Sequence, residues 1–353
     1  MNDQLAVNHG SNVMDDSTAD ARPDKGNRRS KRWSDLLRLR EIQLTLLIVV
    51  IFFAMTAYRP GFASQSNVEF LLLGSVVLGI VTIGQTIVII TKGIDLSVAP
   101  IMGLSAVVTG MLAQQSGLPI TAAVGIALAI GIVLGAINGL LVVVGHIPPI
   151  IATLGTFGLF GGFQFLVTNG AQVSSVPGDF NSFGNGELVP WIPFQVVLLV
   201  LLTAAVTVVL RWTVFGRNVM AVGNNESSAR IAGVRVRWVV FLTYVISGCL
   251  AGFAGLVYVA HVAAATAVTG TSDNYHLQSI AAALIGGTLI SGGRGNVVGS
   301  VLASLFLTLT LTSMVFLGIP AIWNYGGQGL LILAALSLEG RGRASRPLGR
   351  GSR

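Results

Sequence analysis

The chain is a succession of long apolar runs separated by short polar breaks. A transmembrane helix needs roughly 20 mostly apolar residues, and a re-entrant helix needs fewer. The pattern therefore predicts an all-α, polytopic membrane protein with about ten transmembrane helices. The third, eighth and ninth runs are short or interrupted by glycine, so one of them is a candidate half-span. The ten runs lie near residues 42–58, 69–91, 98–114, 119–144, 149–167, 192–210, 238–259, 277–291, 296–316 and 318–337.

The low charge content supports this interpretation. Of the 353 residues, 53% are hydrophobic and 10% are charged, whereas soluble domains carry about 25% charged residues. The single cysteine, Cys249, lies inside an apolar run. It excludes an intramolecular disulfide bond and offers no cluster of metal ligands.

Lysine and arginine are distributed unevenly between the two sides of the runs, and such residues concentrate in cytoplasmic loops. Residues 22–40 carry eight of the 21, residues 341–353 carry five, and the loop after the sixth run carries five more. Lys92 and Arg294 fall on the same side, and Arg59 alone falls on the other. We therefore predict that both termini are cytoplasmic. The net charge of +7 then reflects membrane orientation, and nucleic-acid binding is not expected.

The chain divides into three segments. Residues 1–41 are polar and lack an apolar pattern, which predicts a disordered cytoplasmic N-terminal tail whose basic part lies near anionic lipid headgroups. Residues 42–337 form the predicted transmembrane domain. Residues 338–353 are predicted to be a basic cytoplasmic C-terminal tail.

The sequence lacks the usual motifs of an enzyme. No GxxxxGK[ST] loop is present to hold a nucleotide triphosphate, and no HExxH pair is present to hold zinc. The run GGRGNVVG at 292–299 has the wrong glycine spacing for a dinucleotide loop. The four histidines lie far apart in the sequence. We therefore expect neither catalysis nor a bound metal or cofactor in this chain.

The polar residues inside the runs are neutral. Ion-driven transporters commonly place an ionisable side chain at the middle of the membrane, and no acidic or basic residue occupies the middle of a run here. Neutral groups can bind hydroxyl groups weakly and release them. The alternative role for such groups is hydrogen bonding between helices. The candidate residues of a translocation path are Gln85, Asn138, Thr153, Thr156 and Gln164.

The stretch TKGIDLSVAP at 91–100 places a lysine and an aspartate between two apolar runs. Residues 91–93 are predicted to end one helix, with Gly93 in the left-handed conformation. Asp95 or Ser97 then caps the next helix, and Pro100 falls in its first turn, where its missing N–H is harmless. The simplest interpretation is a helix–turn–helix at the membrane surface with Lys92 and Asp95 solvated.

The basic loop at 211–237 has the signals of a short helix. Asn224 or Asn225 can cap it, Glu226 in the first turn favours the helix dipole, and Gly233 can end it. So short a helix is unstable alone and needs a docking surface. The alternative is an ordinary basic loop on the cytoplasmic side.

Glycines at four-residue spacing predict close helix contacts. Gly131, Gly135 and Gly139 form one ridge, and Gly248 and Gly252 form another. Small residues at this spacing let helix backbones approach one another in lipid. Packing within the bundle is the favoured interpretation, and packing against a second subunit is the alternative.

Four stretches, in order, resemble the ribose-type sugar permeases, the membrane subunits of bacterial ABC importers. GIDLSV is similar to the family's GGIDLSVG pattern, although Lys92 and Ala99 stand where glycine is common. IPPIIATLGT at 147–156 and the glycine-rich run at 285–299 are similar to two further family motifs. Residues 215–236 resemble the family's large cytoplasmic loop, with Ser228 in place of a usual alanine. The resemblance covers roughly residues 42–337.

The resemblance implies an importer subunit in the bacterial plasma (inner) membrane that forms the path for a monosaccharide or related polyol. Its implied partners are a second permease copy or a paralogue, ABC ATPase subunits that hold ATP and Mg, and an extracytoplasmic sugar-binding protein. The family motif at the membrane turn corresponds to Gly93, Ile94, Asp95, Leu96 and Ser97. The implied ATPase-coupling residues are Gly216, Arg217, Gly223, Asn225, Glu226, Ala229, Ile231, Ala232 and Gly233.

Two alternatives remain at this level. The first is an ABC permease for branched-chain amino acids or nucleosides, which belong to the same superfamily. The second is an ion-coupled secondary transporter that acts without an ATPase. The GIDLSV motif favours a sugar, and the loop that resembles a coupling segment counts against a transporter acting alone.

Overall fold

The computed structural model describes residues 40–320, apart from Ser175 and Pro177, and a few isolated positions beyond 320. Both predicted tails, except for Arg40 and Glu41, lie outside the described residues, as do eleven of the 20 residues of the predicted span at 318–337. The described part of the chain is almost entirely helical, which confirms the predicted all-α membrane fold.

Within the part of the chain that the structure describes, eight helices are long and apolar enough to cross a membrane. Each coincides with a predicted run. They are α2 (Arg40–Tyr58), α3 (Gln65–Ile90), α4 (Val98–Ser116), α5 (Ile120–Val143), α6 (Pro149–Thr168), α8 (Phe194–Trp212), α11 (Val236–Val262) and α13 (Val297–Phe316).

The remaining elements are short. They are the 3₁₀ turn Pro60–Ala63, α7 (Gly178–Asn185), α9 (Val214–Asn224), α10 (Glu226–Ile231), α12 (Tyr275–Ile285), β1 (Val173–Ser174), β2 (Glu187–Val189), β3 (Ile192–Pro193) and β4 (Ala264–Ala265). Strand β1 pairs antiparallel with β4, and β2 pairs antiparallel with β3.

The predicted eighth span at 277–291 is the half-span. Helix α12 ends at Ile285, and its 11 residues extend about 16 Å at 1.5 Å per residue, which is half of a bilayer core. Glycines that adopt positive φ at positions 287, 292 and 293 form the turn that follows it. This agrees with the expectation that one of the short or glycine-interrupted runs is a half-span.

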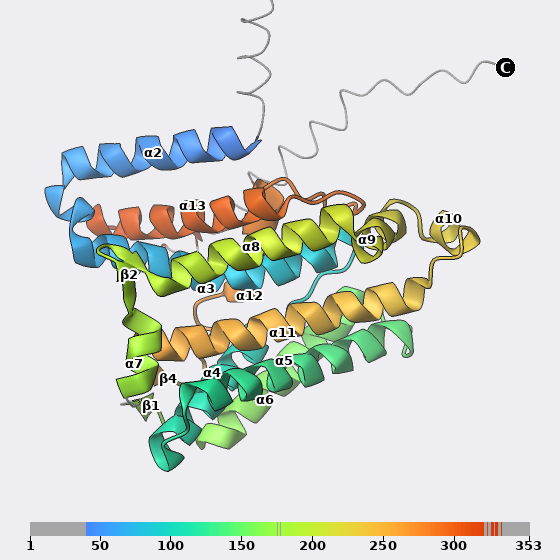
Figure 1. Cartoon of the computed structure of the whole chain (residues 1–353), viewed down its shortest axis with the longest axis horizontal. Helices are drawn as coiled ribbons and strands as arrows, with labels where there is room; N and C mark the ends of the chain where they lie inside the picture. The colour runs from blue at the N-terminus through green and yellow to red at the C-terminus, as the bar shows by residue number, and fades with distance from the viewer. Residues whose placement is uncertain are drawn as a thin grey trace, which may run out of the picture. The chain divides into compact units, whose positions relative to one another are not determined.

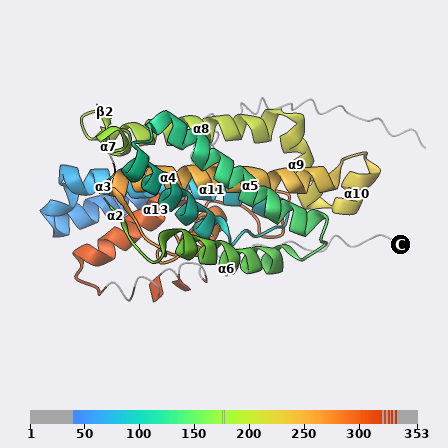
Figure 2. The ribbon, with the colours of Figure 1, turned by 90° about the horizontal axis from the view of Figure 1, so that it is seen from below.

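Helix α3 is the centre of the bundle, and nearly all of its residues from Leu71 to Ile90 are buried. It contacts α8, α11, α12 and α13. Figure 1 shows α4, α5 and α6 on one side of α11, and α3, α8, α13 and α2 on the other. Viewed from below, α6 and α8 lie on opposite sides of α4 (Figure 2).

The two glycine ridges pack against each other. A Cβ on Gly131 would collide with the Gly248 carbonyl, and one on Gly252 would collide with the Ala127 carbonyl. A Cβ on Gly135 would collide with the Tyr244 carbonyl. Helices α5 and α11 therefore approach backbone to backbone, which confirms the prediction of packing within the bundle.

The short elements gather at the two opposite ends of the long helices. Helix α7 and strand β2 lie at one end, and α9 and α10 lie at the other (Figures 1 and 2). The basic residues Arg217, Arg230, Arg235 and Arg237 all belong to the end that carries α9 and α10.

Candidate functional site: a buried turn and a cytoplasmic segment

The turn between α3 and α4 differs from the expected surface turn. Lys92 adopts the left-handed conformation with φ of 66°, and Gly93 does not. Gly93 is required for space, because a Cβ there would lie 2.5 Å from the Tyr244 hydroxyl and 2.8 Å from Val88. The prediction that Gly93 supplies the left-handed residue is therefore wrong.

Asp95 is completely buried, so the interpretation of a solvated carboxylate is also wrong. Its Oδ1 accepts hydrogen bonds from the Ser97 N–H at 3.0 Å and the Ser97 hydroxyl at 2.6 Å. Its Oδ2 accepts one from the Ser247 hydroxyl at 3.1 Å. Burial raises the pKa of Asp95, and these three hydrogen bonds act in the opposite direction by stabilising the ionised form.

The network continues from Ser97 into two further helices. Asn138 on α5 donates to the Ser97 hydroxyl at 2.6 Å. Thr156 on α6 donates to Asn138 Oδ1 at 2.6 Å. With its amide oriented so that both atoms are bonded, Gln85 on α3 pairs with the backbone N–H and carbonyl of Asp95. The turn therefore ties α3, α4, α5, α6 and α11 together.

Four of the five predicted path residues belong to this network, since Thr153 also donates to the Ile94 carbonyl at 3.0 Å. The fifth, Gln164, donates to the carbonyls of Thr266 and Thr269. All five are buried. The structure therefore favours the alternative role for these residues, hydrogen bonding between elements of the chain.

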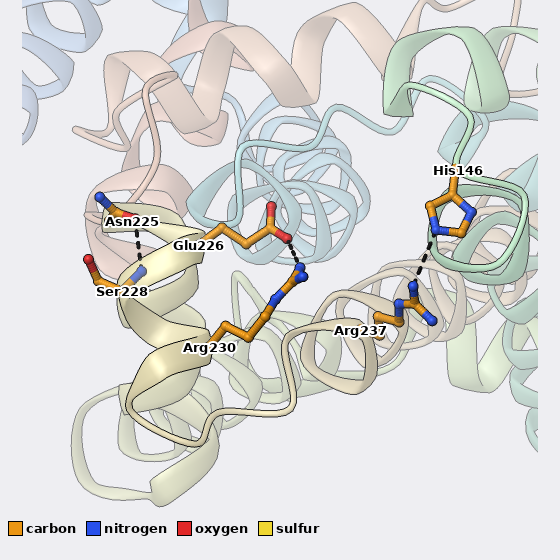
Figure 3. Close-up of polar contacts among 6 residues, drawn as sticks. All are labelled: His146, Asn225, Glu226, Ser228, Arg230 and Arg237. Carbon is orange, nitrogen blue, oxygen red and sulfur yellow. Dashed lines mark hydrogen bonds and ion pairs between the residues drawn. The ribbon is translucent and has the colours of Figure 1, made fainter.

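The cytoplasmic segment folds as two short helices. The Thr213 hydroxyl caps α9 by accepting from the Gly216 N–H at 3.3 Å. Asn225 caps α10 by accepting from the Ser228 N–H at 3.0 Å, and Glu226 pairs with Arg230 at 2.7 Å (Figure 3). Gly233, with φ of 82°, follows the end of α10 as expected.

The sequence interpretation missed α9. Its glycines, Gly216 and Gly223, disfavour a helix intrinsically. Both are buried, together with Val219 and Val222, on the face that packs against the bundle. Tertiary packing therefore decides this helix. The spacing of the buried residues at 216, 219, 222 and 223 is the helical signal that could have revealed it.

The segment at α10 exposes two of its implied coupling residues, Ile231 and Ala232, and buries a third, Ala229. Ala229 is 4% exposed and belongs to the chain's own hydrophobic core. Ile231 is 89% exposed, and Ala232 is also exposed. Burial in this chain's own core does not fit the implied contact of Ala229 with an ATPase, and Ile231 is the large apolar side chain that α10 exposes.

Close backbone packing joins this segment to the turn. A Cβ on Gly223 would collide with the Ile90 carbonyl, which also accepts a hydrogen bond from the Gly293 N–H at 2.9 Å. Lys92 Nζ donates to the Asn224 carbonyl at 3.4 Å. The end of α9, the end of α3 and the glycine turn at 286–296 thus meet at one point. Any displacement of α9 must act on the turn that holds Asp95.

Arg237 at the start of α11 makes a further link at this end. One of its guanidinium nitrogens lies 3.4 Å from His146 Nε2, in the turn between α5 and α6 (Figure 3). Arg217 lies in α9, where it donates to the Trp212 carbonyl at 3.5 Å. Among the described residues no group of three His, Cys, Asp or Glu side chains could hold a metal ion.

Comparison with known proteins agrees with these motifs. The chain is 35% identical over 299 residues to a probable ABC transporter permease protein, y4mJ, of Sinorhizobium fredii, covering 85% of this chain and 89% of the relative. It is 36% identical over 306 residues to the autoinducer 2 import system permease protein LsrC of Klebsiella pneumoniae, covering 87% and 88%.

The LsrC protein of Escherichia coli K12 is 33% identical over 306 residues, again covering 87% of this chain and 88% of the relative. No solved structure matches the chain. A family model described as branched-chain amino acid transport system / permease component matches residues 67–336. The match covers most of the chain and all of the elements that build the Asp95 network, so the chain belongs to this family of transport-system permease components.

Proposed function

We propose that the chain is the membrane-spanning permease subunit of an ATP-driven importer, and that it carries a monosaccharide or a related sugar-like solute. It performs no chemistry on the solute. ATP and Mg belong to a separate ATPase subunit, a second permease copy or paralogue completes the path, and an extracytoplasmic binding protein delivers the solute.

The observation that carries this proposal is the construction of the cytoplasmic end. Helix α10 exposes Ile231 beyond the bundle, while α9 behind it is packed through Gly223 onto the Ile90 carbonyl. A six-residue helix is unstable without support, and here one face is held by Ala229 in the core. The other face is free to meet an ATPase.

The same contacts suggest how ATP hydrolysis acts on the path. A push on α10 is transmitted through α9 to the end of α3 and the glycine turn at 286–296. The Asp95 network then transmits it to α4, α5, α6 and α11 as a unit. Rigid packing favours two discrete arrangements of these helices, as alternating access requires.

The substrate class rests on two observations. The relatives with the LsrC name are described as autoinducer 2 importers, and the GIDLSV motif resembles the ribose-type permeases. The family description names branched-chain amino acids instead, so an amino-acid permease is the second candidate.

The test is reconstitution in lipid vesicles with the ATPase and the binding protein that work with this chain. We expect ATP-dependent uptake of a labelled sugar from a panel that includes D-ribose and D-xylose. Uptake of labelled L-leucine in place of sugars would favour the amino-acid candidate. Uptake driven by an ion gradient without the ATPase would contradict an ABC importer.

A further inference from the structure

The segment between α11 and α12 runs deep into the bundle, although the sequence predicts an outside loop there. A Cβ on Gly103 would collide with the Thr269 carbonyl, and one on Gly270 would collide with the Ala99 carbonyl. Gly103 lies 13 residues before the end of α4 at Ser116, or about 20 Å along the helix. Thr269 and Gly270 therefore lie well inside the length of the membrane-spanning helix α4.

The protein supports this irregular backbone from within. Gln164 donates to the carbonyls of Thr266 and Thr269. The Thr271 N–H donates to the Val268 carbonyl, and the Tyr275 N–H donates to the Gly270 carbonyl. Non-helical backbone at membrane depth occurs where it is buried in protein or lines a water-filled cavity. Broken helices at this depth are where transporters commonly bind solutes.

The exposure of Asp273 indicates which of these two environments surrounds the segment. It lies in this segment immediately before α12, and it is exposed, unlike its buried neighbours Gly270 and Gln278. Its carboxylate has no ion-pair partner among the described residues. A carboxylate at this depth is costly against lipid, so the surface around Asp273 must face water or a polar solute.

Aromatic rings and a histidine lie at the start of α12, which begins two residues after Asp273. The Tyr275 ring packs against the Tyr258 ring of α11, with 6.4 Å between the centroids. The His276 ring lies against Phe157 of α6, with 4.9 Å between the centroids. His276 Nδ1 is shielded from water and has no hydrogen-bond partner among the residues that the structure describes, so a buried polar atom remains to be satisfied.

We propose that Asp273, His276 and Phe157 form a recognition subsite for a polyhydroxylated solute on the translocation path. The carboxylate accepts hydrogen bonds from two neighbouring hydroxyl groups, His276 supplies the unpaired ring nitrogen, and Phe157 covers an apolar face of C–H groups. The proposal rests on the proposed function for its ligand and on the placement of residues 266–276 for its position.

A purely structural role does not account for Asp273. Asn274, not Asp273, is the cap residue of α12, and it makes no side-chain capping bond. The contact that Asp273 makes within the fold uses its backbone carbonyl, which accepts from Gln278 Nε2 at 2.5 Å. The carboxylate therefore does not cap α12, and helix capping does not explain the aspartate at this position.

The first test measures access of water to position 273 without any transported solute. Because Cys249 is the only cysteine in the sequence, Cys249→Ser gives a cysteine-free background. Asp273→Cys in the assembled transporter should react with a charged, membrane-impermeant methanethiosulfonate. Asn181→Cys in α7 is the reactive control. Leu201→Cys, on a 65% exposed apolar position of α8, is the lipid-facing control. An Asp273→Cys protein as unreactive as Leu201→Cys would overturn the proposal.

The second test measures recognition with the labelled sugar that the wild-type transporter imports. Asp273→Asn keeps the shape and loses the charge, and we expect uptake to fall at least tenfold while ATPase association is retained. Asp179→Asn, in α7, is the matched control and should transport like the wild type. Equal uptake by Asp273→Asn and the wild type would refute the subsite. A wild type that imports no sugar would refute the proposed function instead, and the cysteine result would still decide whether position 273 faces a path.

Discussion

At the residue scale, the buried carboxylate of Asp95 joins the turn before α4 to helix α11. Three donors converge on its carboxylate, from Ser97 and Ser247. Asp95→Ala leaves them without an acceptor, and each buried donor left unsatisfied costs about 1–3 kcal/mol. We therefore expect Asp95→Ala to lower the Tm of the purified protein in detergent and to reduce uptake. Asp179→Ala at an exposed site should change neither.

The isosteric substitution Asp95→Asn removes the negative charge of the side chain and keeps its shape. The amide can accept from Ser97 through Oδ1 and donate to the Ser247 hydroxyl through Nδ2, so the network survives. Burial raises the pKa of Asp95 above its ordinary value of 3.8. The folded state then binds the proton more tightly than the unfolded state, and stability falls as pH rises between 3.8 and the raised value.

Asp95→Asn has no such dependence. We expect its Tm to match or exceed that of the wild type at neutral pH, and the difference to grow with pH across that window. Scanning calorimetry of both proteins between pH 4 and 8 measures it. If instead the Tm of the wild type rises relative to that of Asp95→Asn as pH increases, the hydrogen bonds to the carboxylate lower its pKa more than burial raises it.

Sequence reasoning identified the residues of this site better than their roles. Lys92, Gly93 and Asp95 stood out because charge interrupts an apolar pattern, and local rules then predicted a surface turn. Ser247 lies 152 residues from Asp95. Sequence spacing gives no signal that two residues so far apart form a hydrogen bond. The five polar residues taken for a path were recognisable as buried in the membrane. Whether their side chains point toward a solute or toward one another depends on how each helix is rotated about its own axis. The apolar pattern of the sequence does not determine that rotation.

At the element scale, the contact between α5 and α11 depends on the absence of side chains. A Cβ at Gly131 or Gly248 would collide with the backbone of the other helix, and helix packing is the main driving force for association in lipid. We expect Gly131→Val and Gly248→Val to lower the yield of monodisperse protein in detergent and its Tm. Gly125→Val, on the same helix α5 but with nothing within 4 Å of its Cβ, is the control and should behave like the wild type.

Helix α10 offers a second test at this scale, with two neighbouring positions of opposite orientation. Ile231→Glu places a charge on an 89% exposed site, so the protein should fold and reach the membrane in normal amounts. If α10 docks into an apolar groove of the ATPase, this charge becomes buried and unpaired, and binding weakens by several kcal/mol. We expect loss of ATPase co-purification and of ATP-dependent uptake.

Ala229→Glu must behave differently, because Ala229 is buried in the chain's own core. We expect it to lower Tm in the isolated permease as well. Ser227→Glu, at an exposed position of α10, is the charge control. Full co-purification and uptake by Ile231→Glu would leave α10 as an ordinary solvated loop.

At the scale of the whole molecule, the two ends of the bundle must lie on opposite faces of the membrane. Helix α7 lies at one end and α10 at the other (Figure 1), and the arginines of residues 211–237 accompany α10. Positive charge remains on the cytoplasmic side. We therefore expect Asn181 in α7 to be external and Ser227 in α10 to be cytoplasmic.

In the Cys249→Ser background, Asn181→Cys should react with a membrane-impermeant maleimide in intact cells, and Ser227→Cys should react only after the cells are broken. Both side chains are exposed, so burial cannot account for a difference between them.

The result also bears on the remaining span, because α13 ends at Phe316. The Phe316 ring packs against Phe62 in the turn between α2 and α3, and that turn lies at the end of the bundle that carries α7 (Figure 1). A cytoplasmic C-terminus then requires one more crossing after Phe316. Labelling of Ser227→Cys in intact cells would invert this topology, and α10 would then be unable to meet an ATPase.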